Sequence, residues 1–181
     1  MGFSRIKKLK LWIIKMLSHS VLELIAGFVR DADLQEEIAH INPHAVPHMK
    51  EPSVGAQVIA VTAYPLLIQF LSNPCVEALH KVIPEFPQLL VTINGKVPDS
   101  VLIAALIKNR KTFLYIYEPS IPVQEFAVKS YWANIAAITC PSQSVQTIAI
   151  VQTPLAIHSI FGLTNETMVL HNKLWGNVIY I

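Results

Sequence analysis

Three histidines form the first pattern that could do chemistry. His40, His44 and His48 recur every four residues. On one continuous helix this spacing would place three imidazoles on the same face, where they could hold zinc or nickel. Pro43 and Pro47 interrupt any such helix. We therefore expect an exposed segment without a bound metal, in which the three histidines are the only candidates for a metal site.

A second pattern spans residues 89–118. Residues 89–93 predict a strand, and Asn94 with Gly95 is typical of a type I′ hairpin turn. Residues 101–107 are apolar throughout and fit either a strand or a helix. As a strand, they would continue an antiparallel meander. As a helix, they make the segment resemble the start of a Rossmann-like domain. That resemblance implies a nucleotide or SAM site with Gly95 in the turn and Glu118 at a ribose hydroxyl, although such turns use two or three glycines.

Catalytic residues are not predicted. Ser159 follows His158, but adjacent side chains do not face each other on a helix or a strand, and no nucleophile elbow is present. The acids of the central body each lie beside a proline or a turn, and nothing in the sequence pairs them. We expect no cofactor. Whether the chain is an enzyme stays open, and we favour a protein that is not one.

Charge is distributed very unevenly. The first fifteen residues contain five cations and no acid, namely Arg5, Lys7, Lys8, Lys10 and Lys15. From residue 52 to 181 only thirteen of 130 residues are charged, and residues 130–165 carry no charge. A surface with so few charges must consist of amides, hydroxyls and apolar groups, or be covered by a partner, a membrane or further copies.

The basic front predicts contact with an anionic membrane. Its apolar residues lie along one side of a helix, and Trp12 is a residue type that anchors at headgroups. We expect Trp12 and the five cations to form a peripheral membrane-binding site in an intracellular protein. Nucleic acid is not an expected partner, because Lys108, Arg110 and Lys111 are the only basic cluster of the body.

The order of elements predicts an α+β fold. Residues 1–41 form amphipathic helices, with one at residues 33–40 capped by Asp31 or Asp33. Residues 42–52 form a proline- and histidine-rich linker, and residues 53–181 form a compact body rich in strands. Strands are expected at residues 57–63, 89–93, 112–117, 146–152, 167–171 and 177–181, and a helix within residues 72–83. An α/β Rossmann-like fold is the alternative, and no internal repeat stands out.

Three functions follow from these expectations. The first is a non-enzymatic structural protein that binds an anionic membrane and associates with itself. Its layout is loosely similar to that of viral matrix proteins, which combine a basic leading segment with a self-associating core. The second is a Rossmann-like nucleotide- or SAM-binding domain. The third is a small integral membrane subunit that crosses the bilayer with the apolar residues 54–71.

Overall fold

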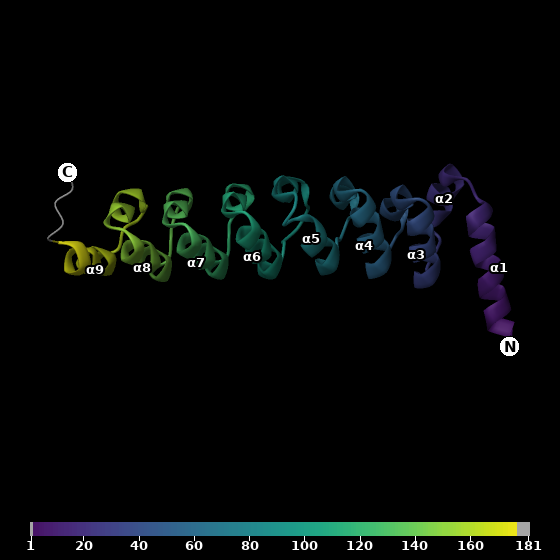
Figure 1. The fold of residues 1–181 in the computed structure, drawn as a ribbon, viewed down its shortest axis with the longest axis horizontal. Helices are drawn as coiled ribbons and strands as arrows, with labels where there is room; N and C mark the ends of the chain where they lie inside the picture. The colour runs from purple at the N-terminus through teal and green to yellow at the C-terminus, as the bar shows by residue number, and fades with distance from the viewer. Residues whose placement is uncertain (1, 177–181) are drawn as a thin grey trace. The chain divides into compact units, whose positions relative to one another are not determined.

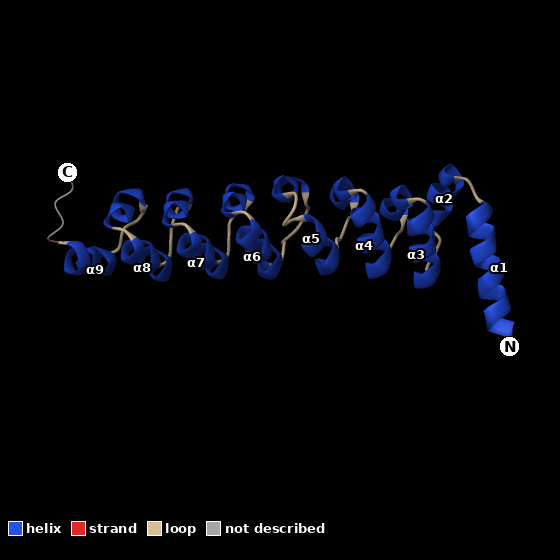
Figure 2. Cartoon of the chain, in the orientation of Figure 1, coloured by secondary structure: helices blue, strands red, loops and turns tan. Residues whose placement is uncertain are grey.

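The regular structure of this chain is helical. A computed structural model describes residues 2–176, with side chains from Lys8 onward, and this part of the chain contains α-helices and 3₁₀ helices but no strand. Figure 2 shows the same assignment along the ribbon. The chain divides into two compact units, Met1–Val101 and Leu102–Ile181. Each unit is described by itself below.

The elements alternate between the two helix types. In the first unit they are α1 (Gly2–Met16), α2 (His19–Ala26), α3 (Ala32–Ile41), η1 (Pro43–His48), α4 (Val54–Ala63), η2 (Pro65–Phe70), α5 (Val76–Val82) and η3 (Pro87–Thr92). In the second unit they are η4 (Arg110–Tyr115), α7 (Ile121–Ser130), η5 (Trp132–Ala137), α8 (Gln143–Gln152), η6 (Pro154–Ser159) and α9 (Asn165–Trp175). Helix α6 (Asp99–Lys108) begins before the division of the chain and ends after it.

A short sequence repeat underlies both units. The α-helices from α3 onward begin at regular intervals, at Ala32, Val54, Val76, Asp99, Ile121, Gln143 and Asn165. The interval is the same throughout, except that one additional residue precedes α6. Each repeat consists of one α-helix followed by one 3₁₀ helix. Such a unit cannot bury its apolar sides alone, so neighbouring repeats must stack to form a core.

Local sequence signals define the repeat. The residue before the α-helix is an N-cap, and the side-chain oxygens of Asp31, Ser53 and Ser142 accept hydrogen bonds from backbone N–H groups three residues on. Helices η1, η2, η3 and η6 each begin with a proline. In η1, η2 and η6 this proline directly follows the C-cap residue of the preceding α-helix. Because proline lacks an N–H and disfavours helical backbone before it, the α-helix cannot continue through this point.

In the first unit, α3, α4 and α5 pack side by side, and their 3₁₀ helices line the other side of the stack (Figure 1). Helices α1 and α2 pack on the first repeat, and Leu22 and Ala26 of α2 are fully buried. Residues 42–52, expected as a linker, contain η1. This 3₁₀ helix contacts α2, α3 and α4 and buries Ala45 and Val46 completely. Here this segment is part of the core.

In the second unit, α7, α8 and α9 pack in the same order, and η5 contacts η6 (Figure 1). The buried residues recur at matching positions of α7 and α8, as the pairs Val123 and Val145, Ala127 and Ala149, and Val128 and Ile150. Small and β-branched residues at these positions let neighbouring helices approach closely. The core is therefore a set of equivalent layers between successive repeats.

The predicted α+β fold is wrong, and so is its Rossmann-like alternative. The segments expected as strands at residues 57–63, 146–152 and 167–171 are α-helices, while residues 89–93 and 112–117 fall mostly in η3 and η4. The hairpin is absent from this part of the chain, because Gly95 lies in a loop after η3. The helices at residues 33–40 and within residues 72–83 are confirmed, and residues 101–107 are helical. The strand expected at residues 177–181 lies outside the described residues.

The error has a physical cause. A helix inside a stack is covered by a neighbour on both sides, so apolar residues occupy most of its circumference. The repeat helices then lose the clear one-sided apolar pattern of an amphipathic helix. Short apolar runs of about this length are indistinguishable from buried strands by periodicity alone.

Buried glutamines tie α3, α4 and α8 to the start of the following helix. In Gln57 the side-chain Oε1 accepts a hydrogen bond from the Cys75 N–H at 2.7 Å, and Nε2 donates to the Pro52 carbonyl at 3.0 Å. At the same repeat position, Gln35 Oε1 accepts from the Ser53 N–H at 2.7 Å and Gln146 Oε1 from the Thr164 N–H at 3.1 Å. Each of these bonds joins a helix to the N-cap residue of the following helix. The amides thus satisfy backbone groups that the stack would otherwise bury unpaired.

Gln124 occupies the same repeat position but makes only half of this tie. Its Nε2 donates to the Pro119 carbonyl at 2.8 Å. Its Oε1 is buried and accepts a hydrogen bond from none of the described residues. The Ser142 N–H, which stands where those of Ser53, Cys75 and Thr164 stand, is therefore not bonded to it.

This contrast predicts unequal costs for one substitution. Gln57→Leu removes two hydrogen bonds and leaves a buried N–H and a carbonyl unpaired, which costs about 2–3 kcal/mol of unfolding free energy. Gln124→Leu removes one bond and the orphaned oxygen with it, so the loss is about 1 kcal/mol or less. Urea denaturation of both variants measures the difference. Equal losses would show that the glutamine ties do not stabilise the stack.

Candidate interaction surfaces

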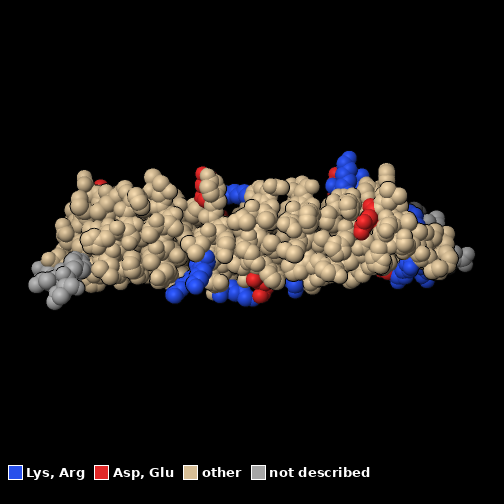
Figure 3. Space-filling view, turned by 90° about the horizontal axis from the view of Figure 1, so that it is seen from above, with Lys and Arg blue, Asp and Glu red and all other residues tan. Residues whose placement is uncertain are grey.

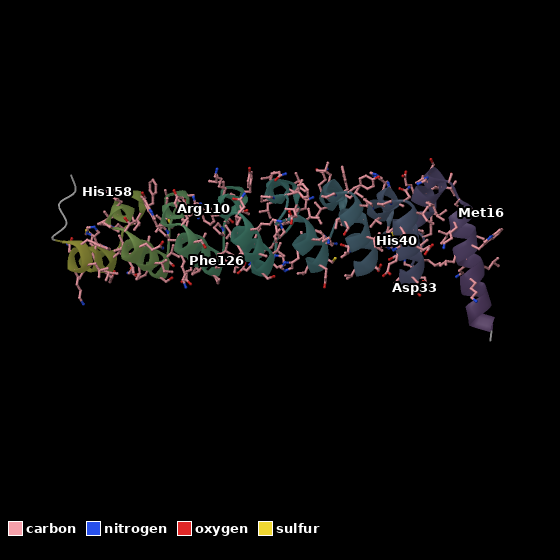
Figure 4. The ribbon with its side chains drawn as sticks, viewed as in Figure 1. Met16, Asp33, His40, Arg110, Phe126 and His158 are labelled. Atoms are coloured by element: carbon pink, nitrogen blue, oxygen red, sulfur yellow. The ribbon has the colours of Figure 1, made fainter. Side chains whose placement is uncertain are left out.

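Helix α1 exposes an apolar stripe to solvent, and lysines lie along one edge of this stripe. Ile14 is buried against the unit, whereas Leu9, Trp12 and Met16 are 57%, 61% and 70% exposed. At about 100° per residue these three side chains fall on one outward face, with Lys8 and Lys15 along its edge. The Lys15 ammonium forms an ion pair with the Glu37 carboxylate of α3 at 2.8 Å. Met16 is labelled at the end of α1 in Figure 4.

The predicted membrane-binding residues are only partly visible in this arrangement. Lys8, Lys10, Trp12 and Lys15 are all exposed. The side chains of Arg5 and Lys7 lie outside the described residues. No helix in the described part of the chain is long and apolar enough to cross a bilayer; residues 54–71 form two short helices, α4 and η2, instead of one long one.

A groove continues the apolar surface from α1 to α2 and α3. It has a volume of about 530 Å³ and includes Ile13, Leu17 and Phe28 in its lining, with Phe28 84% exposed. Lys10 and Arg30 also line this groove. The first unit therefore combines exposed apolar groups and cations over α1 and the segment that follows α2.

The 3₁₀ side of the first unit exposes a second apolar patch. Tyr64, Leu66, Phe70 and Val91 lie at the start of η2, in η2 and in η3, and each is at least half exposed. Helices η2 and η3 contact each other, so these side chains belong to neighbouring repeats. The view in Figure 3 shows that acids and bases occupy only small parts of the surface of each unit on that face.

The 3₁₀ side of the second unit carries cations beside aromatic rings. The Arg110 guanidinium lies over the Tyr131 ring at 4.5 Å from its centroid. Both residues line a groove of about 410 Å³ together with Lys111, Leu114 and several alanines of η5. The stacking holds the guanidinium plane at the edge of this groove.

The loops that precede the α-helices form a further groove, which recurs in both units. In the first unit it has a volume of about 240 Å³ and is lined by residues that include Lys50, Glu51 and Gln57. In the second unit it has a volume of about 530 Å³, and Tyr117, Glu118 and Gln124 occupy the matching positions. The repeat thus forms a groove at the same place in each unit, and different side chains line it.

Gly95 and Glu118, proposed for a nucleotide site in the Rossmann-like alternative, have a backbone role instead. Gly95, Glu118 and Gly162 each lie eight residues after the first residue of the preceding 3₁₀ helix, and their φ angles are +99°, +46° and +68°. These are the residues with positive φ in the described part of the chain. These three loops therefore use left-handed backbone at this position, where glycine is favoured.

The three histidines weighed as metal ligands are divided between two elements. His40 lies in the last turn of α3, whereas His44 and His48 lie in η1. Figure 4 labels His40 on α3. The His44 ring packs on the Tyr64 ring with centroids 4.7 Å apart. Within residues 2–176 no group of three or more His, Cys, Asp and Glu side chains is arranged to hold a metal ion.

Cys75 is an N-cap rather than a nucleophile. Burial raises the pKa of the Cys75 thiol above its ordinary value. The Sγ atom accepts a hydrogen bond from the Ala78 N–H at 3.4 Å. A neutral thiol therefore takes the place that serine or threonine holds in other repeats. Cys140 is exposed and forms no disulfide.

Known proteins offer no relative for these surfaces: no family model matches the sequence, and no significant match exists among curated proteins or solved structures.

The repeat was not predicted from the sequence, although the spacing of glutamines and prolines indicates it. The interval from Gln35 to Gln57 equals the interval from Gln124 to Gln146, and prolines recur at nearly the same spacing. A search for self-similarity at a fixed period would detect these features.

Glu118 provides a test of the loop geometry. Glu118→Gly relieves left-handed strain, and we expect the unfolding free energy to rise by about 0.5–1 kcal/mol. Glu118→Ala removes the same carboxylate but keeps the strain, so its stability should not rise. Thermal unfolding of the two variants separates backbone strain from the loss of charge. A lower midpoint for Glu118→Gly than for Glu118→Ala would contradict the assignment.

Proposed function

We propose that this protein is a non-enzymatic assembly scaffold that binds anionic membranes peripherally through α1 and associates with itself through its repeats. The observation that supports the membrane part most directly is the outward stripe of Leu9, Trp12 and Met16 on α1. Solvent-exposed apolar side chains of this size are unfavourable on a helix that already has a buried face. Insertion into a headgroup region removes them from water.

The charges of α1 support a lipid surface with negative charge. Lys8 lies at the edge of the stripe, Lys10 is exposed on another face of the helix, and Arg5 and Lys7 precede them in the sequence. An amphipathic helix with an aromatic anchor and several lysines lies in the plane of an anionic interface. Lys15 contributes less to such binding, because its ammonium is already paired with Glu37.

Self-association is supported by the low charge of the repeats. The apolar patch formed by Tyr64, Leu66, Phe70 and Val91 faces solvent in the first unit. The net charge of the chain is only +2, so two copies meet without strong repulsion. Repeat stacks present extended surfaces for association, and a second copy is the partner that this proposal assigns to the patch.

Membrane binding can be tested by charge reversal. Lys8→Glu combined with Lys10→Glu should lower binding to phosphatidylserine vesicles at least about twentyfold, because each cation near an anionic surface contributes about 1 kcal/mol. Flotation at low and high salt measures the bound fraction. A matched control reverses Lys50 and Lys96, two exposed loop lysines of the same unit, and should bind nearly as wild type does. If both double variants lost vesicle binding equally, net charge alone would explain the binding, and a specific role for α1 would be contradicted.

The apolar patch can be tested by oligomeric state. Leu66→Ser with Phe70→Ser should lower the mass observed by sedimentation velocity at high protein concentration, because it removes two exposed anchors without altering the buried core. Val151→Ser with Val169→Ser changes two exposed valines of α8 and α9 and serves as the control. Identical sedimentation of wild type and the patch variant would exclude this surface as the interface.

A further inference from the structure

The loop groove of the second unit differs from its counterpart in the first unit in three ways. In the first unit, Lys50 and Glu51 both line the groove, so a cation and an anion offset each other. In the second unit the matching positions hold Tyr117 and Glu118, and Glu118 is the only charged residue in the lining. This groove is also larger, at about 530 Å³ against about 240 Å³. It therefore has net negative charge and an aromatic ring where its counterpart has a lysine.

The second groove also contains an orphaned acceptor. Gln57, in the first groove, has its Oε1 bonded to the Cys75 N–H. Gln124, in the second groove, has an Oε1 that is buried without a hydrogen bond from the described residues. A buried acceptor left unpaired costs free energy, and this repeat retains that cost in a residue that lines the groove.

Glu118 is an unexpected residue for its backbone conformation. Gly95 and Gly162 occupy the matching place in their loops, and all three have positive φ. A side chain there carries a conformational cost that glycine does not have. Strain of this kind is retained where the side chain contributes something else, and here the side chain is a carboxylate that lines the groove together with Tyr117, which is 87% exposed.

We propose that this groove binds an arginine side chain of a basic peptide segment. A guanidinium has five N–H donors in one plane, which suit a carboxylate. The Glu118 carboxylate would accept from it, and the Tyr117 ring would stack on its face. The inference does not depend on membrane binding by α1, because it concerns the second unit alone.

The test uses the full chain and two short peptides. Acetyl-Ala-Arg-Ala-amide carries the guanidinium, and the same peptide with citrulline replaces it with a neutral group of similar shape. Titrations followed by ¹H–¹⁵N NMR should show saturable shifts at residues 116–118 and 137–140 with the arginine peptide. The citrulline peptide should bind at least tenfold more weakly. Equal affinity of the two peptides, or shifts confined to other residues, would overturn the proposal.

Three variants assign the binding to the groove. Glu118→Gly keeps the loop backbone and should weaken binding of the arginine peptide at least tenfold, while Gln124→Leu, which removes only a buried amide, should leave the affinity nearly unchanged. Glu166→Gln removes an exposed carboxylate of α9 in the same unit and should bind as wild type does. Thermal unfolding confirms that each variant is folded. Unchanged affinity in folded Glu118→Gly would exclude this site.

Discussion

The structure depends on one constraint: each repeat has two sides to bury and must be covered by a neighbour on both. The stacking that meets this constraint brings the backbone at the start of each α-helix next to the preceding helix. Gln35, Gln57 and Gln146 pair that backbone with side-chain amides, so that apolar burial does not leave N–H groups unpaired. Helices α1 and α2 cover the first repeat of the first unit, as a terminal capping element must.

The sequence predicted the local features well and the fold incorrectly. Capping residues and prolines identify α3 and α5, because these signals act within a few residues. The strand predictions failed where helices have apolar residues on both sides, since residues 57–63 and 146–152 owe this composition to neighbours that lie a full repeat away in the chain. Exposure of Leu9, Trp12 and Met16 could not be read from the sequence either, because it depends on which face of α1 packs against its unit.

The same stacking explains the unusual surface. A repeat whose core consists of many short layers needs apolar residues throughout, and many of its exposed positions are also uncharged. Residues 130–165 extend across η5, α8 and η6 without a single charge. Charges that do occur on such a surface have little competition nearby. The Arg110 guanidinium on Tyr131 and the Glu118 carboxylate therefore stand out in the second unit as groups that can direct recognition.

Departures from the repeat are more informative about function than its regular positions. Regular positions such as Ala127 and Ala149 are explained by packing alone. Gln124 and Glu118 are not, since one leaves a buried oxygen unpaired and the other places a side chain in left-handed backbone. Both departures cost stability, and both line the same groove. The carboxylate retained at Glu118 despite its backbone cost is the departure that supports binding of a cationic group in this groove.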